Sequence, residues 1–191
     1  AGAAGMACAR FYCALGVKRE NIRMFDSKGL IHKKRSNLAE YKLEFAQEED
    51  LGSLADCMKG TDLFLGLSTK NLVSQDMVRS MADKPVLFAM ANPVPEIMPD
   101  VAKAAGARIV GTGRSDFPNQ VNNVVAFPGI FKGALEGRAT QITEEMKLAA
   151  AEAIAGLVSD EELNDEFIMP EAFDPRVAQV VSEAVRSHIV R

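Results

Sequence analysis

The sequence is poor in the residues that build metal centres and disulfide scaffolds. It contains two histidines, His32 and His188, and three cysteines, Cys8, Cys13 and Cys57, among 191 residues. Two isolated histidines exclude His-rich metal chemistry and give no credible Ser-His-Asp or Cys-His catalytic arrangement. A small, odd number of cysteines argues against a disulfide framework and favours a reducing compartment, so we expect a cytoplasmic protein.

Long apolar runs and a strong charge of either sign are also missing. No run approaches the roughly 20 residues that a membrane-spanning helix needs. The 22 Lys and Arg residues against 26 Asp and Glu residues give a formal net charge of −4. We therefore expect neither nucleic acid nor a membrane as a partner. What is present is an ordinary globular composition, 48% hydrophobic, in a length that suits one large domain or one domain with a helical appendage.

The chain begins inside a glycine-rich turn, Ala1-Gly2-Ala3-Ala4-Gly5. A natural chain seldom starts in this way, so we expect a fragment of a longer protein, with a strand and a catalytic domain upstream. The turn would complete the pattern G-x-G-x-x-G if a glycine preceded Ala1. In that pattern Gly2 lets the backbone approach a pyrophosphate, and Gly5 allows close helix–strand packing. The N–H groups at the start of the following helix hold the negative charge.

Short apolar segments alternate with helical periodicity along the chain. Strands are predicted at residues 22–26, 62–67, 86–91 and 107–111, and helices at 6–15, 38–46, 51–58, 75–81, 100–105, 122–137, 143–158 and from Pro175 to Ile189. The segment 86–91 is apolar without a break, as expected of a strand that is covered on both faces.

Strands that alternate with helices imply parallel β–α units. The predicted fold class is therefore α/β, a Rossmann-like doubly wound parallel sheet. The last two helices have no strand between them, so we expect residues 143–191 to form a C-terminal helical extension of a single dinucleotide-binding domain, 1–191.

Asp26 ends the strand predicted at 22–26, about 20 residues after Gly5, where a dinucleotide-binding fold places an acid that bonds the ribose hydroxyls. Ser27 and Lys28 follow in a predicted turn, and a hydroxyl and a cation there, with Lys42 from the next helix, suit the 2′-phosphate of NADP. The alternative for Asp26 is a glycine-rich surface turn with a solvated acid. The alternative for Ser27 and Lys28 is a plain turn with a solvated lysine.

Ser68 and Asn92 follow the next two predicted strands. Ligands of an open parallel sheet bind at the carboxyl ends of its strands, so both residues are candidates for the dinucleotide site. The Asn92 amide offers a donor and an acceptor, which suits a nicotinamide ribose or carboxamide. The alternative for Asn92 is turn chemistry before Pro93.

Asn122 and Asn123 open a predicted helix. Their amides, together with the helix N-terminus, suit a substrate carboxylate without any formal cation. The alternative is a simple N-cap.

Several separate motifs, in register along nearly the whole chain, resemble the NAD(P)-binding domain of malic enzymes, and the compact bacterial type most of all. These motifs are Ala1-Gly2-Ala3-Ala4-Gly5, Phe25-Asp26-Ser27-Lys28-Gly29-Leu30-Ile31, Phe64-Leu65-Gly66-Leu67-Ser68, Ala91-Asn92-Pro93 and the segment 112–123. The similarity continues through Phe127-Pro128-Gly129 to Phe173-Asp174-Pro175-Arg176.

The resemblance implies oxidative decarboxylation of malate to pyruvate and CO2 with reduction of NAD or NADP. It also implies Mg²⁺ or Mn²⁺ as a Lewis acid at the 2-oxo oxygen. The family's metal carboxylates and its Tyr/Lys pair for proton transfer lie upstream of the glycine turn. We therefore assign no catalytic or metal-binding residue to this chain and expect it to be inactive alone.

The resemblance carries over Gly2, Ala3, Ala4, Gly5, Asp26 and Asn92 to the dinucleotide, and Asn122 and Asn123 to the malate carboxylate. Asp26 favours NAD, whereas Ser27, Lys28 and Lys42 resemble positions in NADP users, and we lean to NAD. The family also suggests a homodimer or higher homo-oligomer. The competing hypotheses are another NAD(P)-dependent hydroxy- or amino-acid dehydrogenase and a non-catalytic nucleotide-binding module.

Overall fold

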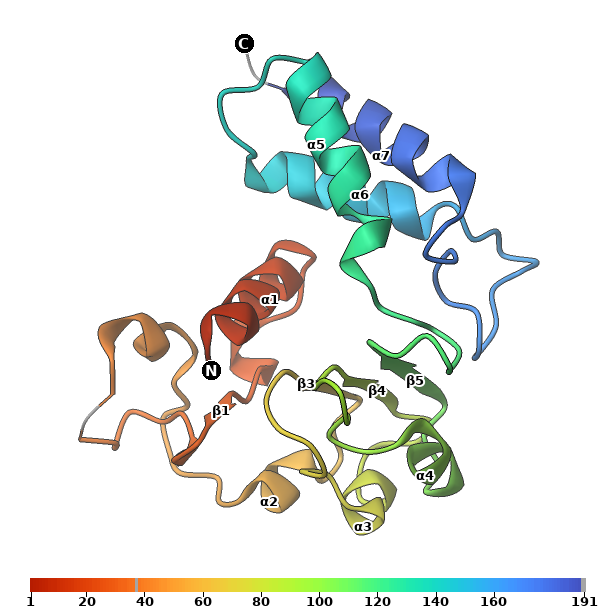
Figure 1. The fold of residues 1–191 in the computed structure, drawn as a ribbon. Helices are drawn as coiled ribbons and strands as arrows, with labels where there is room; N and C mark the ends of the chain where they lie inside the picture. The colour runs from red at the N-terminus through yellow and green to blue at the C-terminus, as the bar shows by residue number, and fades with distance from the viewer. Residues whose placement is uncertain (37, 190–191) are drawn as a thin grey trace.

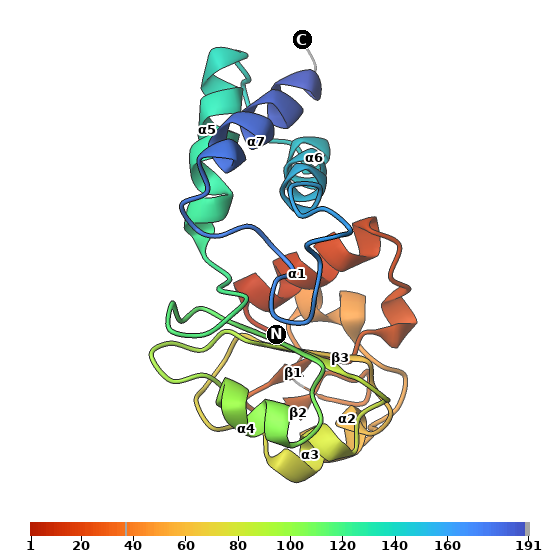
Figure 2. The same cartoon turned by 90° about the vertical axis from the view of Figure 1, so that its right-hand side faces the viewer.

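The computed structural model describes residues 1–36 and 38–189. Within these residues the helices are all too short or too polar to cross a membrane. Figure 1 shows an N-terminal helix and hairpin, a parallel sheet with short helices beneath it, and a helical unit that ends the chain. In Figures 1 and 2, α1 lies between the sheet and α6.

The N-terminal part begins with α1 and continues into a hairpin. Its elements are α1 (Ala3–Ala14), η1 (Arg19–Asn21), β1 (Phe25–Asp26), β2 (Gly29–Leu30) and the 3₁₀ helix η2 (Glu40–Phe45). Gly16 follows α1 with φ +101°, a left-handed conformation that stops a helix and that glycine adopts without strain. Met6, Met24, Ile31 and Phe45 bury their side chains together, which packs α1 onto the hairpin and η2.

Two predictions for this part were wrong. The strand expected at 22–26 is only two residues long, and it pairs with β2 in an antiparallel hairpin rather than with the parallel sheet. The helix expected at 38–46 is a 3₁₀ helix without a capping side chain. In a 3₁₀ helix residues i and i+3 lie on the same side. That geometry places Lys42 and Phe45 together on the side that faces the hairpin.

The parallel sheet is confirmed. It contains β3 (Leu63–Gly66), β4 (Val86–Ala89) and β5 (Ile109–Thr112), hydrogen-bonded in that order with Leu65 opposite Phe88 and Phe88 opposite Gly111. Among the described residues β3 pairs with β4 alone, so its other side is an open edge.

Three short helices cover one face of the sheet: α2 (Leu54–Met58), α3 (Gln75–Arg79) and α4 (Pro99–Ala104). Their apolar side chains meet Phe64, Leu87 and Val110 in the main core. Burial alternates along β4, since Leu87 and Ala89 are fully buried whereas Val86 and Phe88 are only half-buried. Within the described residues the second face of β4 is therefore only partly covered, which falls short of the expectation that residues 86–91 are covered on both faces.

The C-terminal unit packs around its own apolar core, to which residues before and after 143 both contribute. It contains η3 (Asn123–Val125), α5 (Phe127–Glu136), α6 (Glu144–Ala155) and α7 (Pro175–Ser187). Pro128 divides the helix predicted at 122–137 into η3 and α5. Gly129 and Gly133 let α5 approach α7, because a Cβ at either position would lie within 2.6 Å of an α7 atom.

Candidate functional site

The glycine turn forms the N-terminus of α1. Gly2 is the N-cap, with φ −89° and ψ −174°, and no side chain caps the helix. In the part of the chain that the structure describes, the N–H groups of Ala3, Ala4 and Gly5 donate to no protein oxygen. A Cβ added at Gly2 would meet nothing within 4 Å. The turn therefore presents free backbone donors at the positive end of a helix, which is the chemistry that binds phosphate.

Gly5 has a different surrounding from the one expected. A Cβ added there would lie 3.5 Å from the flexible end of Met24, which is ordinary van der Waals contact. The close helix–strand packing that we expected to require this glycine is therefore not found within the described residues.

Asp26 lies beside this turn. The Ala1 backbone nitrogen donates a hydrogen bond to the carbonyl oxygen of Phe25, the residue before Asp26. Ala1 directly precedes Gly2, the N-cap of α1. The helix N-terminus and the acid at the strand end are thus neighbours, as a dinucleotide site requires.

The Asp26 carboxylate is held by two cations. Arg35 binds it in a bidentate manner, with Nη1–Oδ1 at 3.1 Å and Nη2–Oδ2 at 3.2 Å, and Lys42 Nζ lies 2.7 Å from Oδ2. The Lys28 backbone N–H donates to Oδ1 at 2.9 Å. These side chains of Asp26, Arg35 and Lys42 are only 13–16% exposed. Asp26 is therefore a paired acid, and the alternative of a solvated one is wrong.

This pairing changes the acidity of Asp26. Burial raises its pKa, but the hydrogen bonds from Arg35, Lys42 and the Lys28 backbone together hold the pKa far below the ordinary value. The carboxylate therefore stays ionised, and it accepts hydrogen bonds without donating any.

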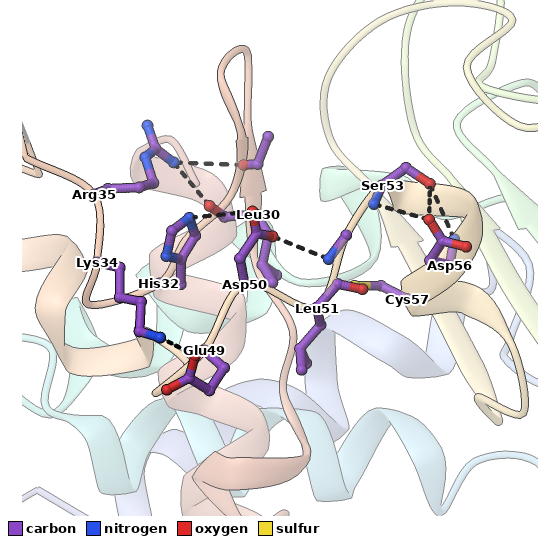
Figure 3. Close-up of polar contacts among 12 residues, drawn as sticks. Leu30, His32, Lys34, Arg35, Glu49, Asp50, Leu51, Ser53, Asp56 and Cys57 are labelled. Atoms are coloured by element: carbon purple, nitrogen blue, oxygen red, sulfur yellow. Dashed lines mark hydrogen bonds and ion pairs between the residues drawn. The ribbon is translucent and has the colours of Figure 1, made fainter.

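The turn residues Ser27 and Lys28 have exposed side chains beside this cluster. A surface hollow of about 280 Å³ opens next to them, lined by Lys28, His32, Lys34, Arg35 and Ser36. Figure 3 shows Arg35 turned toward Leu30, whose carbonyl oxygen it bonds at 3.1 Å, and Lys34 turned toward Glu49.

Ser68 and Asn92 lie at the carboxyl ends of β3 and β4, and a residue that we did not predict joins their loops. Glu96 is fully buried. Its Oε1 accepts from the Ser68 backbone N–H at 2.9 Å, and its Oε2 accepts from the Ala91 N–H at 3.0 Å. The side chains of Ser68 and Asn92 remain exposed.

Asn92 also lies against the next strand end. A Cβ added at Gly113, just after β5, would be 3.0 Å from Asn92 Nδ2. Gly113 therefore leaves the room that the Asn92 amide occupies, and the loops after β4 and β5 are in contact.

Asn122 and Asn123 follow the loop after β5. The Val121 N–H donates to the Thr112 carbonyl oxygen at 2.8 Å, which places the pair beside the carboxyl end of β5. Asn122 Oδ1 accepts from the Val124 N–H at 3.1 Å, so Asn122 is the N-cap that the alternative described. Asn123 is exposed. Within the described residues, no hydrogen bond joins either amide to Asn92.

Two residues of this region were missed by the sequence reasoning. Arg35 stands in a short basic run, Lys33-Lys34-Arg35, and this run is the signal that marks it. Glu96 is a single acid within Val94-Pro95-Glu96-Ile97, and an isolated charge between apolar residues is the signal that marks it.

The described residues contain no group of three or more His, Cys, Asp or Glu side chains that could hold a metal ion. The arrangement therefore offers phosphate donors, an acid with two cations and exposed amides, all without a metal centre in this part of the chain.

Comparison with known proteins agrees with this geometry. Residues 14–190 match the family described as "Malic enzyme, NAD binding domain". The bifunctional malic/malolactic enzyme of Bacillus subtilis (strain 168) is 54% identical over 190 residues, covering 97% of this chain and 46% of the relative. The NAD-dependent malic enzyme of Geobacillus stearothermophilus is 47% identical, covering 96% of this chain and 39% of the relative. Other relatives are named NADP-dependent malic enzymes.

The fold leads to the same family. The crystal structure of Entamoeba histolytica malic enzyme superposes with a TM-score of 0.93 at 40% identity, covering 98% of this chain and 40% of that chain. The chain thus spans less than half the length of these three proteins. The match over residues 14–190, the relatives and the shared fold together show that the chain belongs to the malic enzyme family, as its NAD-binding domain.

Proposed function

We propose that the protein containing this chain is a malic enzyme that converts malate to pyruvate and CO2 while reducing NAD or NADP. In this proposal the chain supplies the dinucleotide site and some of the residues that contact malate. The observation that carries it is the hydrogen bond between Ala1 and Phe25. This contact puts the free N–H groups of α1 beside Asp26, so phosphate donors and an acceptor for ribose hydroxyls adjoin each other.

The turn Gly2-Ala3-Ala4-Gly5 would receive the pyrophosphate on its backbone N–H groups. Asp26 would accept hydrogen bonds from the adenosine ribose hydroxyls, because its carboxylate is held ionised by Arg35 and Lys42.

Ser68 and Asn92 would contact the nicotinamide end from the carboxyl edge of the sheet. Their exposed side chains and their connection through Glu96 support this placement. When bound, the dinucleotide accepts a hydride from malate. Asn123, and the free Nδ2 donor of Asn122, would orient the malate carboxylate so that its C2 hydrogen faces the nicotinamide.

The divalent metal belongs to the proposal for the whole protein. The described residues do not fit a Mg²⁺ or Mn²⁺ site, so we place its ligands, and the Tyr/Lys pair for proton transfer, outside this chain.

We infer a preference for NAD over NADP. Asp26 already engages Arg35 and Lys42, the two cations that would otherwise face a 2′-phosphate. Its own negative charge also repels that group. Ser27 and Lys28 remain exposed beside it and would support NADP binding if Asp26 were removed.

We also infer a cytoplasmic homo-oligomer. The three cysteines are free thiols, which suits a reducing compartment. Phe127, Phe131 and Leu135 form an apolar stripe on α5 that is 50–78% exposed, and such stripes commonly mark an interface.

The test is malate-dependent reduction of NAD and of NADP, followed at 340 nm with Mg²⁺ or Mn²⁺ in excess. We expect the intact protein to be active, with the higher kcat/KM for NAD, and the chain alone to be inactive. Lactate is measured in the same samples, because the Bacillus subtilis relative is named as a bifunctional malic/malolactic enzyme.

Asp26→Ser is the matched variant for cofactor choice. Freeing two cations that each form charge-assisted hydrogen bonds should shift the NADP-to-NAD ratio of kcat/KM upward by about tenfold or more. An intact protein that reduces neither dinucleotide with malate would refute the proposed reaction, and a chain that turns over alone would show that we have misplaced the catalytic groups.

A further inference from the structure

Glu96 is a fully buried carboxylate that the proposed chemistry does not use. It lies in the segment after β4, and among the described residues it has no ion-pair partner. Burying a carboxylate is costly unless hydrogen bonds replace its water. Its position therefore calls for an explanation beyond packing, since an apolar side chain of similar volume would fill the same space.

The carboxylate connects two loops rather than two strands. Oε1 accepts from the N–H of Ser68, two residues after β3, and Oε2 accepts from the N–H of Ala91, two residues after β4. Each Glu96 carboxylate oxygen accepts a hydrogen bond from one loop, so both oxygens must act as acceptors at the same time. The backbone adds to this connection, because the Val73 N–H donates to the Glu96 carbonyl oxygen at 3.0 Å.

Gly66, the last residue of β3, leaves the space that the Glu96 carboxylate occupies. A Cβ at Gly66 would lie 2.4 Å from the Glu96 carboxyl carbon and 2.6–2.7 Å from its oxygens. Any side chain at this position would displace the carboxylate from the two N–H groups. Glycine here provides space, and no unusual backbone angle is involved.

The second loop also contacts the end of β5 through Asn92. Asn92 directly follows Ala91, and its amide lies beside Gly113. One carboxylate thus bonds the loop that carries Ser68 and the loop that carries Asn92, and the second loop lies against the end of β5. The three loops form the edge where an open parallel sheet binds its ligand.

We propose that Glu96 is a positioning residue for the dinucleotide, holding the loops after β3 and β4 so that Ser68 and Asn92 face the nicotinamide half together. This inference rests on the proposed function for the identity of the bound molecule. A preformed site avoids the cost of ordering two loops on binding, so losing Glu96 should weaken dinucleotide binding more than malate binding.

The test is Glu96→Gln in the intact protein. The amide has nearly the same volume but one acceptor oxygen in place of two, so one of the two N–H groups is left facing an NH2 group. We expect the KM and the calorimetric Kd for NAD to rise about tenfold or more, with the KM for malate changed less than twofold. Glu96→Asp keeps both acceptors on a shorter side chain and should recover part of the affinity. Glu136→Gln, an exposed glutamate on α5, is the matched control and should have no effect.

A Glu96→Gln protein that melts at a lower temperature but keeps the wild-type Kd for NAD would overturn the proposal, since it would show a purely structural role. Hydrogen exchange of the wild type without dinucleotide gives a test that needs no variant. We expect the Ser68 and Ala91 amides to be protected already, and fast exchange at both would equally overturn the proposal. A wild type that binds NAD but does not oxidise malate would refute the proposed reaction and leave the Kd comparison valid.

Discussion

Replacing Asp26 with Asn should destabilise the chain at neutral pH, because it removes the charge that Arg35 and Lys42 share. The variant keeps the shape of the side chain and can still accept from the Lys28 N–H. Exposed ion pairs are worth about 0–1 kcal/mol, whereas breaking a buried pair costs about 3–5 kcal/mol. The three side chains are 13–16% exposed, so they lie between these limits, and we expect a loss of about 2 kcal/mol.

The pH dependence tests the cause of this loss. The pKa of Asp26 is lowered in the folded protein from an ordinary 3.8. A lowered pKa stabilises the fold fully above the unfolded value, and this stabilisation is lost as the pH falls toward the folded value. The difference between wild type and Asp26→Asn should therefore be constant from pH 8 to about 5 and shrink by about 1 kcal/mol at pH 3.

Thermal melts followed by circular dichroism at pH 7 and pH 3 measure both effects. About 2 kcal/mol corresponds to a shift of about 4–8 °C for a chain of this size. Asp116→Asn is the matched control, since Arg114 also binds Asp116 in a bidentate manner, through Nε and Nη2, but the side chains are 33% and 56% exposed. A variant at Asp26 that costs no more than the one at Asp116, or a difference that does not narrow at pH 3, would refute the reasoning.

Four further variants test packing and hydrogen bonding by urea unfolding. Gly133→Ala should cost about 1–3 kcal/mol because its Cβ would lie 2.6 Å from a backbone oxygen of α7, whereas Gly5→Ala, whose Cβ would make only ordinary van der Waals contact with Met24, should be neutral or gain up to about 1 kcal/mol. Asn119→Ala removes two donated bonds and one accepted bond at a buried position, so a loss of about 3 kcal/mol is expected, and a loss below about 1 kcal/mol would contradict the role of these bonds. Thr143→Ala removes the α6 cap and should cost about 1 kcal/mol; an unchanged midpoint would show that the cap contributes nothing.

Three helix starts could be predicted from the sequence because their signals are local. Ser74 accepts from the Met77 N–H, Thr143 accepts from the Met146 N–H and Asp174 accepts from the Arg176 N–H. Each cap needs only a short polar side chain within three residues of its partner. The parallel sheet followed in turn from the alternation of apolar segments with these helices.

The segments around the hairpin could not be predicted in the same way, because long-range contacts decide their form. The 3₁₀ helix η2 has no cap of its own, and its Lys42 and Phe45 are held by Asp26 and by the core under α1. The segment 22–26 has strand-like residues, but β2 is the strand with which it pairs, so a two-residue hairpin results.

The same difference between local signals and long-range contacts decides which residues of the candidate site could be predicted. Asp26 could be predicted because it lies at a fixed spacing from the glycine turn, and its pairing with Arg35 came only from the fold. Glu96 is distant in sequence from Ser68, its partner, and nothing local indicates that a buried carboxylate will face two backbone N–H groups.

The open edge of β3 has a practical consequence for work on the chain by itself. Leu63 at its start and Leu67 just after its end are each 40% exposed, beside unpaired backbone groups. An uncovered apolar strand is a template on which other strands add. We therefore expect the isolated chain to aggregate at high concentration. A synthetic peptide that pairs with the β3 edge should prevent this aggregation.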